Sequence, residues 1–206
     1  MQIYGQGLYH YDIPISAVGF RVADAVTLVL AIPLLVISSL LYRRGSLKGG
    51  LLLVGALAYF LYNYGSIAFG AAYTTLFLVY VALFSASLFG VVLALTSFDV
   101  QGLPTHFTAG LSRRGIGLFL AVSGVILLQW LVLSIVPALL QGTAPSVVAS
   151  STTFITGVVD EGIVAPALIV AGALLLRRTP LGYLLASMML VFTVALGPNP
   201  TAVEDK

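Results

Sequence analysis

Long apolar stretches separated by short breaks of Gly, Pro or charged residues run through the whole chain. Each stretch is close to the ~20 residues that an α-helix needs to cross a bilayer. The stretches are nearly unbroken, whereas the strands of a membrane barrel alternate between apolar and polar residues. The pattern predicts an all-α polytopic membrane protein with six transmembrane helices, over residues 22–42, 51–67, 73–96, 115–136, 152–176 and 181–196. Residues 22–197 would form a single six-helix bundle between two extracytoplasmic tails, residues 1–21 and 198–206.

Composition narrows the class of protein further. Hydrophobic residues make up 60% of the 206 positions and charged residues 8%, which excludes a soluble globular domain and a disordered chain. No cysteine is present, which excludes disulfides, thiolate metal sites and iron–sulfur clusters. A net charge of +2 is too small for a nucleic-acid partner. We find no phosphate-binding loop or nucleophile motif, so we expect no cofactor and no catalytic residue.

Basic residues predict the orientation of the helices in a cell membrane. Lysine and arginine accumulate on the cytoplasmic side of membrane proteins. Six alternating spans place seven of the nine on one face, and the exceptions are Arg21 and Lys206. The seven are Arg43, Arg44, Lys48, Arg113, Arg114, Arg177 and Arg178. Both termini should therefore be extracytoplasmic. This topology puts His10 and His106 on opposite faces, so we expect no two-histidine metal site.

Tyrosines gather toward the predicted outer interface. One interpretation is an aromatic belt at the level of the headgroups, and the other is a cavity open to the outside. Tyr59, Tyr62 and Asn63 share one helix face by their spacing of three and four residues, which favours a common lining. The residues concerned are Tyr4, Tyr9, Tyr11, Tyr59, Tyr62, Tyr64 and Tyr73, together with Trp130.

The first and last predicted hairpins carry the same features in the same order. Asp24, Pro33, Arg43, Arg44 and the glycines at 49–50 correspond to Asp160, Pro166, Arg177, Arg178 and Gly182. This order predicts a parallel repeat of two helices on either side of a central pair, although chance matches are easy in apolar sequence. Both prolines lie within apolar helices, where proline removes a backbone donor, and they predict bent helices.

Acidic residues inside predicted helices are the strongest indication of function, because a charge at the bilayer centre costs at least ~2.5 kcal/mol. Asp160 and Glu161 lie roughly 12 Å below the outer end of the fifth span at 1.5 Å per residue, and Arg21 and Asp24 begin the first span. Asp24 also belongs to a stripe of small or polar residues at helical spacing that should face other helices, the others being Thr27, Ala31 and Ser38.

Two interpretations of these charges stay open. Adjacent helical residues diverge by about 100°, so Asp160 and Glu161 should not act as a dyad, and one of them should pair with Arg21. The pair is either a structural salt bridge or a proton- or cation-responsive site. In the second case Asn63, Gln129 and the nearby tyrosines would supply further polar groups.

Several segments resemble uncharacterised multispan prokaryotic membrane proteins. The resemblance rests on Gly-Leu-Tyr at 7–9, Ala-Tyr-Phe-Leu-Tyr at 58–62, Leu-Phe-Leu-Val-Tyr-Val-Ala-Leu-Phe-Ser at 76–85, Asp-Glu-Gly-Ile-Val-Ala-Pro-Ala at 160–167 and Arg-Arg-Thr-Pro-Leu-Gly-Tyr at 177–183. It implies a polytopic architecture, but no activity, substrate or site residue.

Three functions are compatible with these observations. A small transporter or channel-like protein, moving a small solute or cation through an acidic site in the outer half of the bilayer, fits the polar residues and bent helices. A structural or regulatory subunit of a membrane complex fits the small size and the small-residue faces. An intramembrane enzyme acting on a lipid or quinone would use Asp160 or Glu161 as acid or base, but it lacks a nucleophile. Membrane lipids, a second copy or a complex partner would contact its surface.

Overall fold

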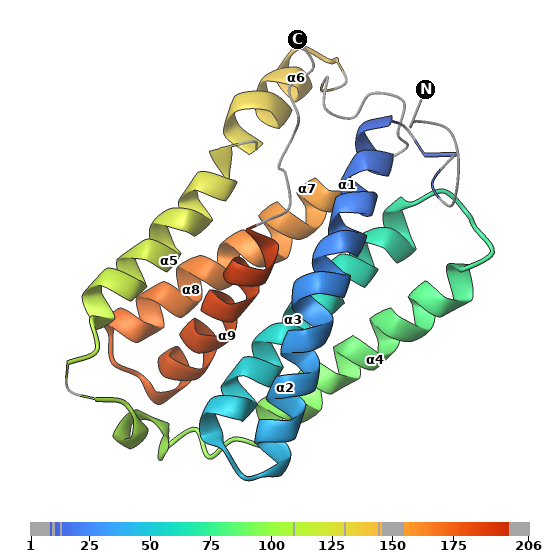
Figure 1. The fold of residues 1–206 in the computed structure, drawn as a ribbon. Helices are drawn as coiled ribbons and strands as arrows, with labels where there is room; N and C mark the ends of the chain where they lie inside the picture. The colour runs from blue at the N-terminus through green and yellow to red at the C-terminus, as the bar shows by residue number, and fades with distance from the viewer. Residues whose placement is uncertain are drawn as a thin grey trace. The chain divides into compact units, whose positions relative to one another are not determined.

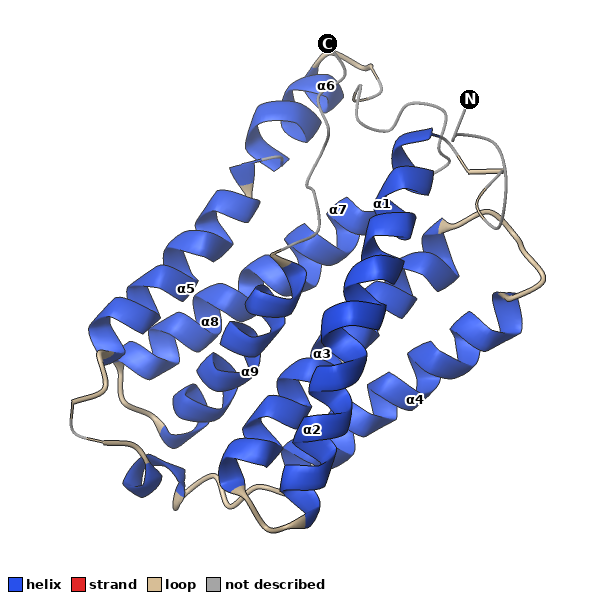
Figure 2. Cartoon of the chain, viewed as in Figure 1, coloured by secondary structure: helices blue, strands red, loops and turns tan. Residues whose placement is uncertain are grey.

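The computed structural model describes residues 9, 11–12, 14–108, 110–129, 131–143, 145 and 155–197, and these residues contain helices and loops but no strand (Figures 1 and 2). They form about six helical rods, five of them long and apolar enough to cross a membrane. The protein is therefore membrane-embedded and all-α, as the hydropathy pattern predicts. The chain divides into two compact units, residues 1–97 with 191–206, and residues 98–190.

The first unit contains three membrane-length rods. In the first of them, α1 (Pro14–Val26), a π-helical turn η1 (Thr27–Ala31) and α2 (Ile32–Arg43) follow one another without a break. The other two rods are α3 (Leu47–Gly70) and α4 (Phe77–Thr96).

The second unit repeats this combination of α- and π-helical segments. Its elements are the 3₁₀ turn η2 (Leu103–His106), α5 (Arg113–Leu127), the π turn η3 (Leu131–Ile135), α6 (Val136–Leu140), α7 (Ile155–Val159), the π turn η5 (Asp160–Val164), α8 (Ala165–Leu176) and the first part of α9 (Pro180–Leu196). The last residues of α9, from Val191, belong to the first unit. At 17 residues, α9 is shorter than the five long rods.

Three features of the helices differ from the sequence-based expectation, and two of them are helix starts. The first helix begins at Pro14 rather than at residue 22, so Arg21 and Asp24 lie within it and not at its start. Proline is favoured in the first turn of a helix because that turn needs no backbone donor. The second helix begins at Leu47 rather than at residue 51, because the Ser46 hydroxyl accepts a hydrogen bond from the Gly49 backbone N–H at 3.3 Å and caps it.

The third difference concerns proline within helices. Each π turn ends two residues before a proline, namely Pro33, Pro137 and Pro166. The N–H of Ile32 bonds to the carbonyl of Thr27, and the N–H of Ala165 bonds to that of Asp160, each five residues back. This wider turn accommodates the proline ring, which clashes with the carbonyl four residues back in a regular α-helix. Two of these distortions were predicted as bends, whereas Pro137 was expected in a loop.

Small residues allow helices α5 and α8 to pack with their backbones in contact. A Cβ atom added at Gly172 would overlap the carbonyl oxygen of Gly117, and one added at Gly124 would lie 2.7 Å from the carbonyl oxygen of Ala165. Close approach at small residues is the common mode of helix association in membranes, because lipid tails are as apolar as the helix surface and the hydrophobic effect does not drive helices together. The close contact between α5 and α8 is therefore made at glycine and alanine residues.

The two tight corners, between α2 and α3 and between α8 and α9, have the same hydrogen bonds. Ser46 N–H bonds to the Leu41 carbonyl and Gly45 N–H to that of Tyr42, and Thr179 and Arg178 donate in the same way to Leu174 and Leu175. Such a Schellman motif needs a left-handed residue. Gly45 provides it with φ of 76° and Arg178 with φ of 58°.

Candidate functional site

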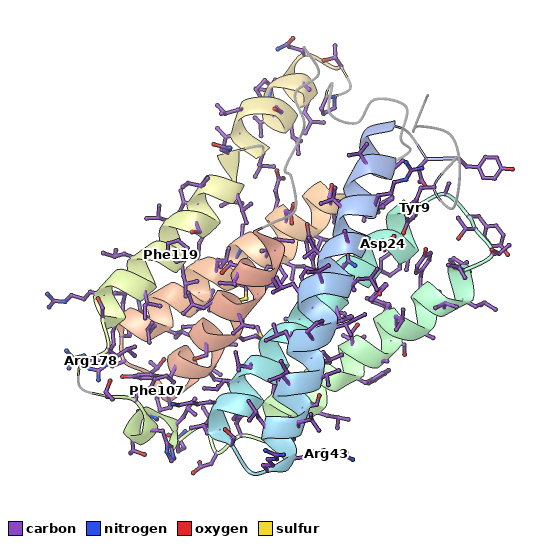
Figure 3. The ribbon with its side chains drawn as sticks, viewed as in Figure 1. Tyr9, Asp24, Arg43, Phe107, Phe119 and Arg178 are labelled. Atoms are coloured by element: carbon purple, nitrogen blue, oxygen red, sulfur yellow. The ribbon has the colours of Figure 1, made fainter. Side chains whose placement is uncertain are left out.

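Polar side chains of the first unit meet in two neighbouring clusters, and the first surrounds Asp24. The hydroxyl of Tyr9 donates a hydrogen bond of 2.9 Å to Asp24 Oδ2 and lies 3.4 Å from the hydroxyl of Tyr80. Figure 3 shows Tyr9 and Asp24 facing one another beside α1. The ring of Tyr64 stacks on that of Tyr80 with centroids 6.3 Å apart. We call these four residues the Asp24 centre.

Tyr9 precedes the first helix but is buried, with 3% of its surface exposed. This burial, followed by its hydrogen bond with Tyr80 and the charge of Asp24, raises the pKa of the Tyr9 hydroxyl well above its ordinary value. The hydroxyl therefore stays protonated and acts as a donor to the carboxylate.

The second cluster lies one turn further along the first rod. Thr27 Oγ1 accepts a hydrogen bond of 3.3 Å from Asn63 Nδ2 and lies 3.2 Å from the hydroxyl of Tyr59. That hydroxyl also lies 3.4 Å from the backbone carbonyl of Ala23, to which it donates. Thr27, Tyr59 and Asn63 are all buried, and we call them the Thr27 cluster.

Helical spacing explains how the sequence builds both clusters. Asp24 and Thr27 are three residues apart at the junction of α1 and η1, and Tyr59 and Asn63 are four residues apart on α3, so each pair shares a helix face. The predicted inward stripe is confirmed for Thr27, Ala31 and Ser38, all of which are buried. Tyr9 and Tyr80 were not predicted as partners of Asp24, because sequence spacing cannot connect residues from three separate segments.

The remaining predicted groups of the first unit are placed differently. Tyr62 points to α9, where its ring meets that of Phe192 edge-on with centroids 5.6 Å apart. Tyr11 and Tyr73 are exposed, whereas Ser66, one turn beyond Asn63, is buried and its hydroxyl oxygen has no hydrogen-bond partner among the described residues.

In the second unit Glu161 occupies a π turn that faces another π turn. It lies in η5, and its carboxylate accepts a hydrogen bond from the backbone N–H of Leu131, the first residue of η3. Its Oε1 atom is buried and has no partner among the described residues. Gln129 lies two residues before Leu131 and is exposed. Asp160 begins the same π turn as Glu161.

The predicted contact between Arg21 or Asp24 and the acidic pair would join the two units, and it stays a prediction. His106 lies in η2, and His10 and Trp130 fall outside the described residues. Where the chain is described, no three His, Asp or Glu side chains come together as a metal site would require. Comparisons with protein-family models, curated proteins and solved structures find no match to this chain, so its function must be argued from these polar clusters.

Proposed function

We propose that the protein is a small membrane transporter or channel-like protein, and that the Asp24 centre and the Thr27 cluster bind a small cation or polar solute during passage. One observation carries the proposal. Six side chains that bear a hydroxyl, amide or carboxylate form two neighbouring hydrogen-bonded groups, Tyr9, Asp24 and Tyr80 in one and Thr27, Tyr59 and Asn63 in the other, and all but Tyr9 lie on membrane-length helices. Hydrocarbon offers these groups no partners, so a gathering of this kind indicates a polar path or binding site.

The chemistry of the two clusters favours a cation or a proton-coupled solute. Asp24 is the one carboxylate among the six, and its Oδ2 is held by the Tyr9 hydroxyl. Hydroxyl and amide oxygens of the Thr27 cluster can replace the hydration shell of a passing ion. The buried hydroxyl of Ser66, which has no partner in the described part of the chain, extends the same face of α3 beyond Asn63.

Glu161 supplies a second acidic position of the same kind. Its buried Oε1 lacks a partner among the described residues, as expected of an oxygen that takes up a proton or a cation. We place both acidic positions in the outer half of the bilayer. This placement follows from the seven basic residues on the opposite face and from six spans, with α9 as the last.

We further propose that the first and last hairpins are copies of one unit. Pro33 and Pro166, Gly45 and Arg178, Ser46 and Thr179, and Gly49 and Gly182 are all separated by the same number of residues. Gly49 and Gly182 each lie against the backbone of the preceding helix, where a Cβ atom would not fit. In this register Asp160 corresponds to Thr27 and not to Asp24. The two copies would thus carry polar residues at the start of equivalent π turns.

A transport assay with the full chain in lipid vesicles tests the function. Proton flux is followed with an enclosed pH dye under imposed Na⁺ or K⁺ gradients. We expect Asp24→Asn to reduce the flux at least tenfold while the protein remains folded by circular dichroism. The control is Asp99→Asn, which removes an equal charge from a loop carboxylate that accepts a bond from the Gly102 N–H. Wild-type vesicles that pass neither protons nor these cations would refute the proposal and favour a subunit of a larger complex.

A further inference from the structure

Four arginines lie at one end of the second unit. Arg113 and Arg114 begin α5, while Arg177 and Arg178 follow the last residue of α8. The two helices run antiparallel and touch one turn inside these ends, because a Cβ atom at Gly117 would meet Leu176 Cγ and the carbonyl of Gly172. We call these four residues the arginine end. Figure 3 labels Arg178 there, near Phe107.

No carboxylate balances this charge within the described part of the unit. Its acidic residues there are Asp99, which is bound to the Gly102 N–H, and Asp160 and Glu161 in η5. The twelve residues of α8 separate η5 from Arg177, which is roughly 18 Å at 1.5 Å per residue. None of the four guanidinium groups has an ion-pair partner among the described residues. This end of the unit therefore carries a positive charge that the described carboxylates leave unbalanced, and an anion from outside the protein would neutralise it.

The guanidinium group of Arg113 lies against an aromatic ring, and its Nε–H has no hydrogen-bond acceptor among the described residues. It lies over the ring of Tyr183 at 5.8 Å from the centroid, and that ring packs on Phe107 with centroids 5.0 Å apart. Its Nε atom is buried and has no hydrogen-bond partner among the described residues. This cation–π contact orients the guanidinium group but does not neutralise its charge.

Arg178 stands where the backbone favours glycine. Its φ of 58° is the left-handed conformation of the Schellman position, which the other corner fills with Gly45. A side chain in this region is disfavoured by contact between its Cβ and the backbone. Because the corner itself would fold better with glycine, local folding does not account for the exposed arginine at 178.

We propose that the arginine end binds the phosphate group of an anionic phospholipid. The location favours a lipid over a free anion, because the candidate spans Arg113–Leu140 and Ile155–Leu176 begin and end here, at the level of the headgroups. Leu118, Phe119 and Leu176 expose apolar side chains on the adjoining turns, where acyl chains would lie. Guanidinium groups bind phosphate oxygens in a bidentate manner, which ammonium groups cannot do.

Thermal unfolding of the full chain in a neutral detergent tests the proposal. Phosphatidylglycerol and phosphatidylcholine with identical acyl chains are titrated in parallel, and sodium phosphate is titrated in a third arm. We expect phosphatidylglycerol to raise the melting temperature with a saturable dependence, and the other two to have little effect. Equal stabilisation by phosphatidylcholine would refute the proposal, and equal stabilisation by phosphate would assign the site to a free anion instead.

Arg178→Gly gives the sharpest variant because its two effects have opposite signs. Without lipid it should unfold at a higher temperature than the wild type, because the strained residue is removed. Its affinity for phosphatidylglycerol should fall about fivefold, the equivalent of one basic residue near an anionic surface. Arg177→Gln should weaken binding to a similar degree.

Arg43→Gln is the matched control, since it removes the same charge from the end of α2 in the other unit. It should change the affinity less than twofold. An equal loss in Arg43→Gln would mean that the lipid responds to net charge alone, and no loss in Arg178→Gly would mean that Arg178 does not bind the lipid. Either result would overturn the proposed site.

Discussion

Gly172→Ala should destabilise the second unit even though alanine is the better helix former. The added Cβ would overlap the carbonyl oxygen of Gly117 and lie 2.9 Å from the backbone N of Ala121, both of them atoms of α5. Backbone atoms cannot rotate away as a side chain does, so α5 and α8 must separate. Overpacking of this kind costs about 1 to 3 kcal/mol. The gain in helix propensity returns up to about 1 kcal/mol, which leaves an expected net loss of up to about 2 kcal/mol.

Gly162→Ala is the matched control for this loss. Gly162 lies on the same rod and is exposed, and no atom lies within 4 Å of its added Cβ. The variant should therefore be as stable as the wild type, or more stable by up to about 1 kcal/mol through propensity. Unfolding would be measured by circular dichroism in mixed micelles as the fraction of sodium dodecyl sulfate is increased. If Gly172→Ala unfolds at the same fraction as Gly162→Ala, the backbone contact between α5 and α8 does not hold the unit together.

Three further predictions concern the polar clusters and the orientation. In a double-mutant cycle with Thr27→Val and Asn63→Leu, the double variant should lose less free energy of unfolding than the sum of the two single variants. The expected difference is about 0.6 kcal/mol, a typical value for a hydrogen bond between membrane helices. Additive losses would mean that the 3.3 Å contact contributes nothing. A cysteine at Thr75 should react with an impermeant maleimide on intact cells and one at Ser112 should not, and the reverse result would invert the topology. Because the pKa of Tyr9 is raised in the folded state, its contribution to stability is present below pH 10, its ordinary value, and is lost as the pH rises above that value. Tyr9→Phe should accordingly lose less stability than the wild type between pH 10 and pH 12, and identical pH profiles would contradict the raised pKa.

The sequence by itself predicted membrane embedding and helical structure, because both follow from local properties. A continuous apolar run of about 20 residues can satisfy its backbone in hydrocarbon as a helix or in a closed barrel, and the unbroken pattern favours the helix. The inward direction of Thr27, Ala31 and Ser38 was predictable for the same reason, since helical spacing fixes which residues share a face. The distortions at Pro33 and Pro166 were predictable in the same way, because proline has no backbone N–H to donate.

Tertiary structure decided which groups meet Asp24. Its hydrogen bond comes from Tyr9, which precedes the first helix, and the next hydroxyl comes from Tyr80 on α4, so three segments must pack before the centre exists. Sequence spacing describes neighbours along one helix and carries no information on contacts between helices. The sequence predicted a loop from Pro137, but in the structure the helix continues to Leu140. The π turns therefore depend on more than local sequence. The backbone N–H of Leu131 can reach Glu161 only after α5 and α8 have packed through their glycines. A pattern of side chains along the sequence does not predict this backbone contact.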